Sequence, residues 1–188
     1  MSPLLKKNKP AGTLISGSLI LLTMVLALAT TACSGSQASA SDQDLTKYVD
    51  PYIGTDYHGH VFIGANVPFG AIQPGPTNYV KGWDWCSGYH YSDSIMTGFS
   101  QLHLSGTGIG DLGDVLITPY TGERYFGPGN QDNPLAGYAS MYTHDRETAE
   151  PGYYSVDLLD YDIRAEMTAT ERVALHQYTF PESDKSRI

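Results

Sequence analysis

Basic residues are scarce in this chain of 188 amino acids. Eleven Lys and Arg stand against 20 Asp and Glu, which gives a formal net charge of −9 at pH 7. Lys6, Lys7 and Lys9 all lie at the amino terminus, so the rest of the chain is still more acidic. Because nucleic-acid binding depends on cationic side chains that neutralise phosphates, this balance excludes nucleic acid as an expected partner.

Long apolar runs are also few. One spans residues 14–29, after the amino-terminal lysines, and it is shorter than a typical transmembrane helix. Thr31-Ala32-Cys33 follows and resembles the end of a bacterial lipoprotein signal, although Thr30 stands where an aliphatic residue is usual. We therefore predict a signal peptide over residues 1–32 and lipidation of Cys33, with ordinary cleavage nearby as the alternative.

The expected location follows from this signal. Residues 33–44 are small, polar and without periodicity, which predicts a flexible tether. The protein is then an exported bacterial lipoprotein, anchored to a membrane in the periplasm or at the cell surface. Cysteine is limited to Cys33 and Cys86, so lipidation leaves Cys86 without an intramolecular partner. We expect Cys86 to be a free thiol that packs as a small hydrophobe.

Helical periodicity is absent after the signal. No window repeats apolar residues every 3.6 positions over a usual helix length, whereas period-2 alternation occurs at residues 97–104 and 163–168. Further strands are expected at residues 115–117, 153–159 and 172–180. Frequent Gly and Pro predict strands and turns over residues 45–75, and a long loop over residues 121–152. The prediction is an all-β, antiparallel β-sandwich over residues 45–188, incomplete at its carboxyl end.

Residues 82–114 combine aromatics, glycines, histidines and aspartates more densely than any other part of the chain. Indoles beside carboxylates and imidazoles suit a ligand surface better than a packed core, because the polar groups must be paired or remain hydrated. Flat aromatic faces and hydrogen-bonding side chains together favour a sugar as the ligand. The alternative is a glycine-rich sandwich loop whose aromatics only pack.

Four other chemistries find weaker support. The pattern GIGDLG at residues 108–113 fits a nucleotide fingerprint, but the strand-like residues 114–119 follow it where a helix would be needed. His58 and His60 have the spacing of a zinc pair, and they serve equally well as hydrogen-bond partners. Ser100 lacks the second glycine of a nucleophile motif. Glycoside chemistry needs two carboxylates that face one another, and no spacing in the sequence predicts this for any pair. The candidate carboxylates are Asp84, Asp93, Asp111 and Asp114.

Several motifs in order resemble the amino-terminal domain of glycoside hydrolase family 92. They are residues 48–55 (YVDPYIGT), 58–70 (HGHVFIGANVPFG), 82–91 (GWDWCSGYHY), 103–108 (HLSGTG), 111–114 (DLGD), 170–172 (TER) and 178–181 (YTFP). The resemblance runs from about residue 47 to the end of the sequence. Ile63 stands where the family more often has proline, and Asn66 where it often has threonine.

This resemblance implies an exo-acting, calcium-dependent α-mannosidase that inverts the anomeric centre. The catalytic acid, the base and most calcium contacts are expected on an (α/α)6 barrel outside this chain, so no catalytic or metal-ligating residue is assigned here. The chain would supply one wall of the pocket for α-mannoside glycans, and by itself it is predicted to be inactive. The alternative is a carbohydrate-binding lipoprotein without catalytic activity. The predicted substrate-binding residues are Gly64, for close backbone approach, and Trp83, Asp84, Trp85, His90 and His103.

Overall fold

The structure is a computed structural model that describes residues 44–110, 113–130 and 132–188. The predicted signal peptide, the lipidation of Cys33 and all of the tether except Asp44 lie outside the described residues. Within these ranges no helix is long and apolar enough to cross a membrane. The described chain contains no α-helix, and its only helical elements are 3-10 turns of three residues each: η1 (Thr46–Tyr48), η2 (Trp83–Trp85), η3 (Pro134–Ala136) and η4 (His144–Arg146).

The larger sheet is an antiparallel meander of four strands in the order β5-β6-β7-β8. Its members are β5 (Glu147–Glu150), β6 (Tyr153–Leu158), β7 (Ile163–Ala169) and β8 (Ala174–Thr179). Along β7 the alternate residues Ile163, Ala165 and Met167 are buried, whereas the residues between them are more exposed. The alternation arises because one face of the sheet covers the core and the other faces outward. The strands predicted at residues 153–159, 163–168 and 172–180 are confirmed.

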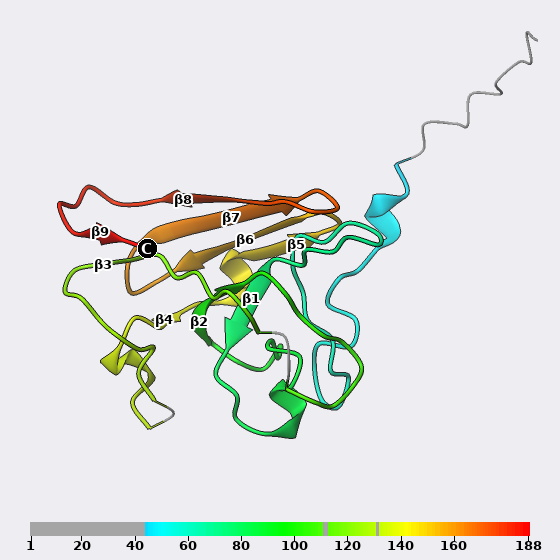
Figure 1. The fold of residues 1–188 in the computed structure, drawn as a ribbon, viewed down its shortest axis with the longest axis horizontal. Coiled ribbons are helices and arrows are strands. Elements are labelled where there is room, and N and C mark those ends of the chain that lie inside the picture. The colour runs from blue at the N-terminus through cyan, green and yellow to red at the C-terminus, as the bar shows by residue number, and fades with distance from the viewer. Residues whose placement is uncertain (1–43, 111–112, 131) are drawn as a thin grey trace, which may run out of the picture. The chain divides into compact units, whose positions relative to one another are not determined.

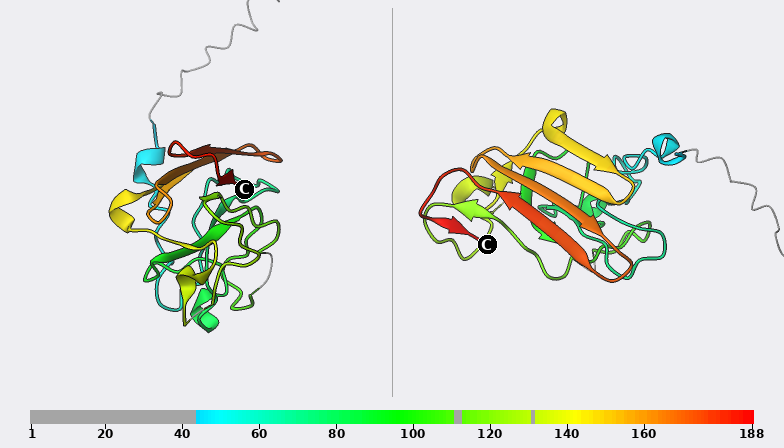
Figure 2. Two further views of the ribbon diagram at one scale, coloured as in Figure 1. Left: turned by 90° about the vertical axis from the view of Figure 1, so that its left-hand side faces the viewer. Right: turned by 90° about the horizontal axis from the view of Figure 1, so that it is seen from above.

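A second layer lies beneath this meander (Figure 1). It is a three-stranded antiparallel sheet in the order β1-β2-β4, built from β1 (Gly75–Asn78), β2 (Ile95–Ser100) and β4 (Ser140–Met141). The short strands β3 (Tyr120–Thr121) and β9 (Ser186–Arg187) pair separately. Figure 2 shows the two larger sheets stacked face to face. The all-β sandwich predicted from the sequence is therefore confirmed.

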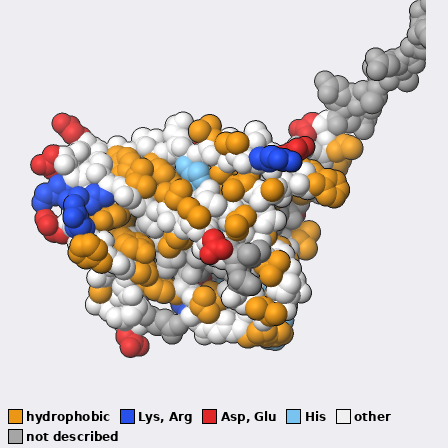
Figure 3. Space-filling view, in the orientation of Figure 1, with side chains coloured by type: hydrophobic (Ala, Val, Ile, Leu, Met, Phe, Trp, Pro, Cys, Tyr) orange, Lys and Arg blue, Asp and Glu red, His pale blue; other side chains and the backbone are white. Residues whose placement is uncertain are grey.

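The two layers share one core. Phe99 of β2 is fully buried, and its ring centroid lies 6.5 Å from that of Tyr154 in β6 and 6.0 Å from that of Tyr178 in β8. Aromatic rings at such separations pack across the interface between the sheets. Toward the β8 side the burial decreases, and Val173 and Leu175 are 62% and 65% exposed. Figure 3 shows hydrophobic side chains gathered on this face of the molecule.

Three expectations about strands were wrong. Residues 115–117 do not form the buried strand that was expected. Ile117 makes an isolated bridge to Phe99, and Val115 is 68% exposed, because no extended pairing with a strand of the described chain covers it. The loop expected over residues 121–152 contains β4 and β5, whose Ser, Thr and Glu residues hide the usual strand signal. The alternation expected over residues 97–104 ends early, since β2 stops at Ser100 and is buried on both faces.

Candidate functional site

The surface around η2 brings together the polar and aromatic residues of the dense stretch. A 3-10 turn has about three residues per turn, so three consecutive side chains leave it in three different directions. Trp83 is 61% exposed, Asp84 is part-buried, and Trp85 turns toward the protein. The turn is held by backbone hydrogen bonds from Trp85 N to Gly82 O (3.2 Å) and from Cys86 N to Trp83 O (3.1 Å).

Asp84 is the acidic centre of this surface. Its Oδ1 accepts a hydrogen bond from His58 Nδ1 at 2.5 Å and lies 3.5 Å from His60 Nε2. The His58 hydrogen bond, followed by the charge of the imidazoles, holds the pKa of Asp84 below its ordinary value. The carboxylate is therefore ionised at neutral pH, and no described residue bonds its Oδ2. His60 Nε2 is buried and has no hydrogen-bond partner among the described residues.

Trp83 covers the two histidines. Its ring centroid lies 4.2 Å from that of His60 in an edge-on arrangement and 5.6 Å from that of His58. The indole Nε1 donates a hydrogen bond to Gly108 O at 2.9 Å. A Cβ at Gly108 would lie 2.7 Å from this nitrogen, and the residue has φ +68°, so the indole position requires glycine there. The indole is fixed on one side and open to solvent on the other.

Trp85 and His90 are held inside the domain. Their rings stack with a centroid separation of 4.2 Å and an interplanar angle of 20°. The His90 ring is buried, and its two nitrogens contact Ser92 Oγ (2.8 Å) and Tyr57 O (3.3 Å). Trp85 Nε1 donates to the carboxylate of Asp93 at 2.8 Å. In this structure both rings satisfy their polar groups internally, and their contact with a sugar stays a prediction.

His103 and Gly64 lie deeper. His103 is 2% exposed, its Nδ1 lies 2.9 Å from Gln73 O, and its ring stacks on Phe62. Burial lowers its pKa, so the imidazole is neutral. A Cβ at Gly64 would lie 2.2 Å from Pro74 O, which shows that the close backbone approach at this glycine is to the protein itself. The roles of both residues toward a sugar also stay predictions.

The structure places only some of the predicted site residues on one surface. Trp83, Asp84 and His58 form a surface around the buried His60. The sequence left both histidines open between zinc ligation and hydrogen bonding. Within the described ranges, no group of three or more His, Cys, Asp or Glu side chains is arranged to hold a metal ion. The spacing His58-x-His60 was the signal available in the sequence, but only the fold shows that both imidazoles face Asp84.

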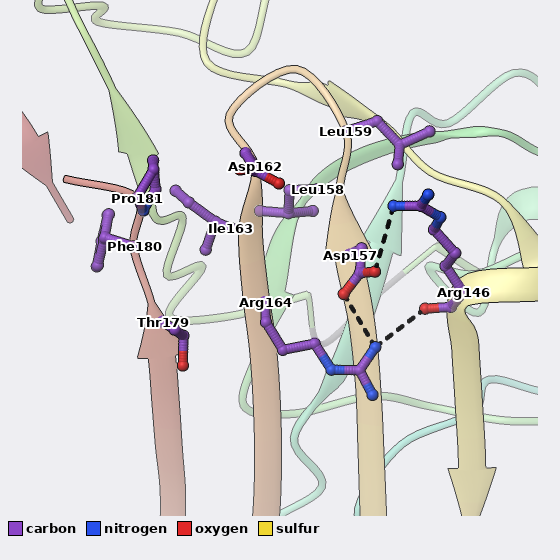
Figure 4. A pocket seen from close by; sticks show the side chains of 10 residues that line it. All are labelled: Arg146, Asp157, Leu158, Leu159, Asp162, Ile163, Arg164, Thr179, Phe180 and Pro181. Atoms are coloured by element: carbon purple, nitrogen blue, oxygen red, sulfur yellow. Dashed lines mark hydrogen bonds and ion pairs between the residues drawn. The ribbon is translucent and has the colours of Figure 1, made fainter. Parts of the chain in front are cut away.

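A separate cavity of about 290 Å³ lies at the turn between β6 and β7 (Figure 4). Asp157 lies between two guanidinium groups there, 3.0 Å from Arg164 Nη1 and 3.7 Å from Arg146 Nη1. Leu159, Phe180 and other apolar residues complete its wall. None of the predicted site residues lines this cavity, and its ion pairs satisfy one another. The surface around η2 is therefore the stronger candidate.

An exposed indole beside an ionised carboxylate and imidazoles, presented by a β-sandwich, is typical of proteins that act on carbohydrates. The family described as "Glycosyl hydrolase family 92 N-terminal domain" matches residues 48–188. The chain belongs to this family of glycoside hydrolases, whose solved members include mannosidases.

Individual relatives agree with this assignment. An uncharacterized secreted glycosidase of Arthroderma benhamiae is 32% identical over 155 residues, covering 78% of this chain and 19% of that protein. A family GH92 alpha-mannosidase of Bacteroides thetaiotaomicron, solved with mannoimidazole, is 49% identical with a TM-score of 0.73 and covers 77% of this chain. A GH92 inverting mannosidase of Bacteroides thetaiotaomicron VPI-5482 is 27% identical with a TM-score of 0.58 over 75% of this chain. The chain spans about a fifth of each relative's length.

Proposed function

We propose that this chain is the amino-terminal part of an exo-α-mannosidase that removes terminal α-linked mannose from glycans with inversion. The names of the solved relatives support this proposal, one as an alpha-mannosidase and one as an inverting mannosidase. The catalytic (α/α)6 domain is proposed to lie in the part of the enzyme that this chain does not contain. The domain described here would then form one wall of the mannose pocket.

The observation that carries the proposal is the arrangement of Trp83, Asp84 and His60. The outer part of the indole is open and can pack on the apolar face of a sugar ring. Asp84 Oδ2 can accept a hydrogen bond from a sugar hydroxyl, and the buried His60 Nε2 lies 3.5 Å from the other carboxylate oxygen, Oδ1. Trp83 and Asp84 therefore offer one apolar and one polar contact within a single surface, and His60 lies beside the carboxylate.

The electrostatics favour binding over proton transfer at Asp84. An inverting glycosidase needs a carboxylic acid whose pKa is raised and a second carboxylate roughly 6.5 to 9.5 Å away, with a water between the second group and the sugar. The pKa of Asp84 is lowered instead, because His58 donates a hydrogen bond to it. Asp84 therefore suits recognition of a hydroxyl, and the acid and base are proposed to be supplied by the catalytic domain.

Calcium dependence is proposed for the whole enzyme. The ion is proposed to bind mainly outside this chain, as the family resemblance implies. Calcium, when bound, would supply positive charge that polarises and orients sugar hydroxyls. In this chain, Trp83 and Asp84 would orient the sugar.

Export and lipid anchoring are proposed as well. The name of the secreted Arthroderma glycosidase supports export, and the sequence Thr31-Ala32-Cys33 supports an anchor. Acyl chains contribute about 0.8 kcal/mol of membrane affinity per buried CH₂. Cys33→Ala should therefore move the protein from the membrane fraction to the soluble fraction. An unchanged distribution, with a mass that differs from that of the parent only by the substituted side chain, would contradict lipidation.

The test of the pocket wall uses the enzyme that carries this domain. Trp83→Ala should lower kcat/KM on an α-mannoside about tenfold, because one stacking contact of about 1.4 kcal/mol is lost. The melting temperature should stay close to that of the parent, since the indole is mostly exposed.

Phe126→Ala is the matched control, because it removes a 93% exposed aromatic ring that lies outside the η2 surface. Its kcat/KM should equal that of the parent enzyme. If Trp83→Ala is as active as Phe126→Ala, the surface around η2 does not contact the substrate and the pocket assignment is wrong.

A further inference from the structure

The η2 segment is fastened to the core by one buried carboxylate. The side chain of Asp93 is fully buried, and it follows His90 of the dense stretch by three positions. Its Oδ1 accepts hydrogen bonds from Ser94 N (2.8 Å) and Ile95 N (3.0 Å) at the start of β2. Because Ile95 begins a strand whose residues are all buried, the carboxylate is held rigidly by the sandwich.

The same carboxylate receives two donors from the η2 segment. Lys81 Nζ donates to Oδ1 at 2.8 Å, and Trp85 Nε1 donates to Oδ2 at 2.8 Å. Lys81 and Trp85 stand on either side of Trp83 and Asp84 in the sequence. Asp93 therefore closes a short loop at both of its ends, and Trp83 and Asp84 lie in the middle of that loop.

The other polar side chains of the η2 segment bond in different directions. Asp84 bonds outward to His58, and the Trp83 indole bonds the backbone carbonyl of Gly108. Lys81 Nζ also lies 5.8 Å from the centre of the Trp85 ring, so the two donors support one another. A buried carboxylate that accepts four hydrogen bonds loses much of its stabilising effect when a single acceptor is replaced by a donor.

We infer that Asp93 is a positioning residue for the sugar-contacting surface, acting through Trp83 and Asp84 rather than touching the substrate. This inference rests on the proposed function of that surface. In Asp93→Asn, the amide group places an N–H donor opposite either the Trp85 indole or the Lys81 ammonium. The loop can then shift relative to β2, and the indole of Trp83 moves from the position that it needs for stacking.

The test is a double-mutant cycle on kcat/KM in the enzyme that carries this domain. The enzymes are the parent, Asp93→Asn, Trp83→Ala and the double variant, each measured well below its melting temperature. Asp93→Asn alone should lower kcat/KM about fivefold to tenfold. In the Trp83→Ala background it should lower kcat/KM less than about twofold, since residues that act through one contact are not additive.

The matched control is Asp160→Asn. Asp160 accepts hydrogen bonds from Ser140 Oγ at 3.2 Å and Met141 N at 2.6 Å, and these partners lie in β4 rather than in the η2 segment. Its effect on kcat/KM should be small and the same in both backgrounds. Because Asp93 is buried whereas Asp160 is exposed, each variant is assayed at the same interval below its own melting temperature, so that a difference in stability is not read as a positioning effect.

The outcomes separate the inference from the proposed function. If Trp83→Ala is fully active, the pocket assignment in the proposed function fails and no positioning role remains to be explained. If Trp83→Ala is impaired but Asp93→Asn has no effect, or has the same effect in both backgrounds, only the inference is overturned. Should Asp93→Asn not fold, Trp85→Phe replaces it in the cycle, because it removes the indole donor and keeps a ring that can stack on His90.

Discussion

The four-stranded meander and the η2 surface are built on different principles. In the meander, strands β5 to β8 follow one another along the chain and pair with their neighbours in a regular antiparallel register. The η2 surface gathers residues from three distant segments, around His58, Trp83 and Gly108, through side-chain contacts. From this difference we expect substitutions in the shared core to affect stability most and substitutions at the η2 surface to affect binding most.

The strongest way to test this division is to remove a ring from the core that both sheets share. Phe99→Ala should reduce the free energy of unfolding by about 3 to 5 kcal/mol, because Phe99 is fully buried between the layers. Denaturant unfolding of the enzyme that carries this domain, followed by a probe in the sandwich, measures the change. Trp83→Ala serves as the comparison, and an equal loss in both variants would contradict the division.

A backbone contact beneath the η2 surface should come next in size. In Gly64→Ala the new Cβ would lie 2.2 Å from Pro74 O, so the two segments must separate. Overpacking of this kind costs about 1 to 3 kcal/mol. Gly127→Ala is the control, because a Cβ at that position would have no atom within 4 Å. Thermal melting should distinguish the two variants, and equal melting temperatures would show that the Gly64 region adapts without strain.

The buried histidine should make stability depend on pH. Burial lowers the pKa of His103 in the folded state, so the unfolded chain binds a proton more readily than the folded chain. The resulting stability is fully present above the unfolded pKa of about 6.5 and is lost as the pH falls below it. Burial lowers the pKa of His176 as well, so it adds to the same trend.

Melting temperatures measured between about pH 7.5 and pH 5.5 test this linkage. The parent should melt at lower temperature as the pH falls. His103→Gln should show a shallower dependence, whatever its stability at pH 7.5, because one of the two histidines whose pKa burial lowers is removed. The same slope in both proteins would exclude His103 as a source of the pH dependence.

The smallest effect on stability is expected at the η2 surface itself. Asp84→Asn should leave the melting temperature essentially unchanged, because the carboxylate is at the surface and its partner His58 is largely exposed. The affinity for an α-mannoside should nevertheless fall about tenfold, since a charged acceptor for a sugar hydroxyl is lost. Asp145→Asn, in the exposed turn η4, is the control. Unchanged affinity in Asp84→Asn would remove this carboxylate from the proposed pocket.

Alternation and turn residues were enough to predict the meander and the all-β class. Ile163, Ala165 and Met167 alternate with polar residues, and such a period-2 pattern has only one arrangement that buries its apolar set. The alternation of apolar and polar residues did not predict strands β1, β4 and β5. Their residues, such as the Gly-Pro-Thr-Asn of β1, become strand only because neighbouring segments supply the hydrogen bonds.

The sequence by itself determined which residue types gather in the dense stretch, and the ordered motifs between residues 48 and 181 were enough to indicate the family. It could not tell Trp83 from Trp85 or His60 from His103, because identical side chains two or more positions apart carry no local signal of exposure. The tertiary structure decided this by placing Asp93 under Trp85, Gln73 against His103, and open solvent beside Trp83. Those contacts join segments that are 8 to 30 residues apart, and only the folded backbone sets the distances between them.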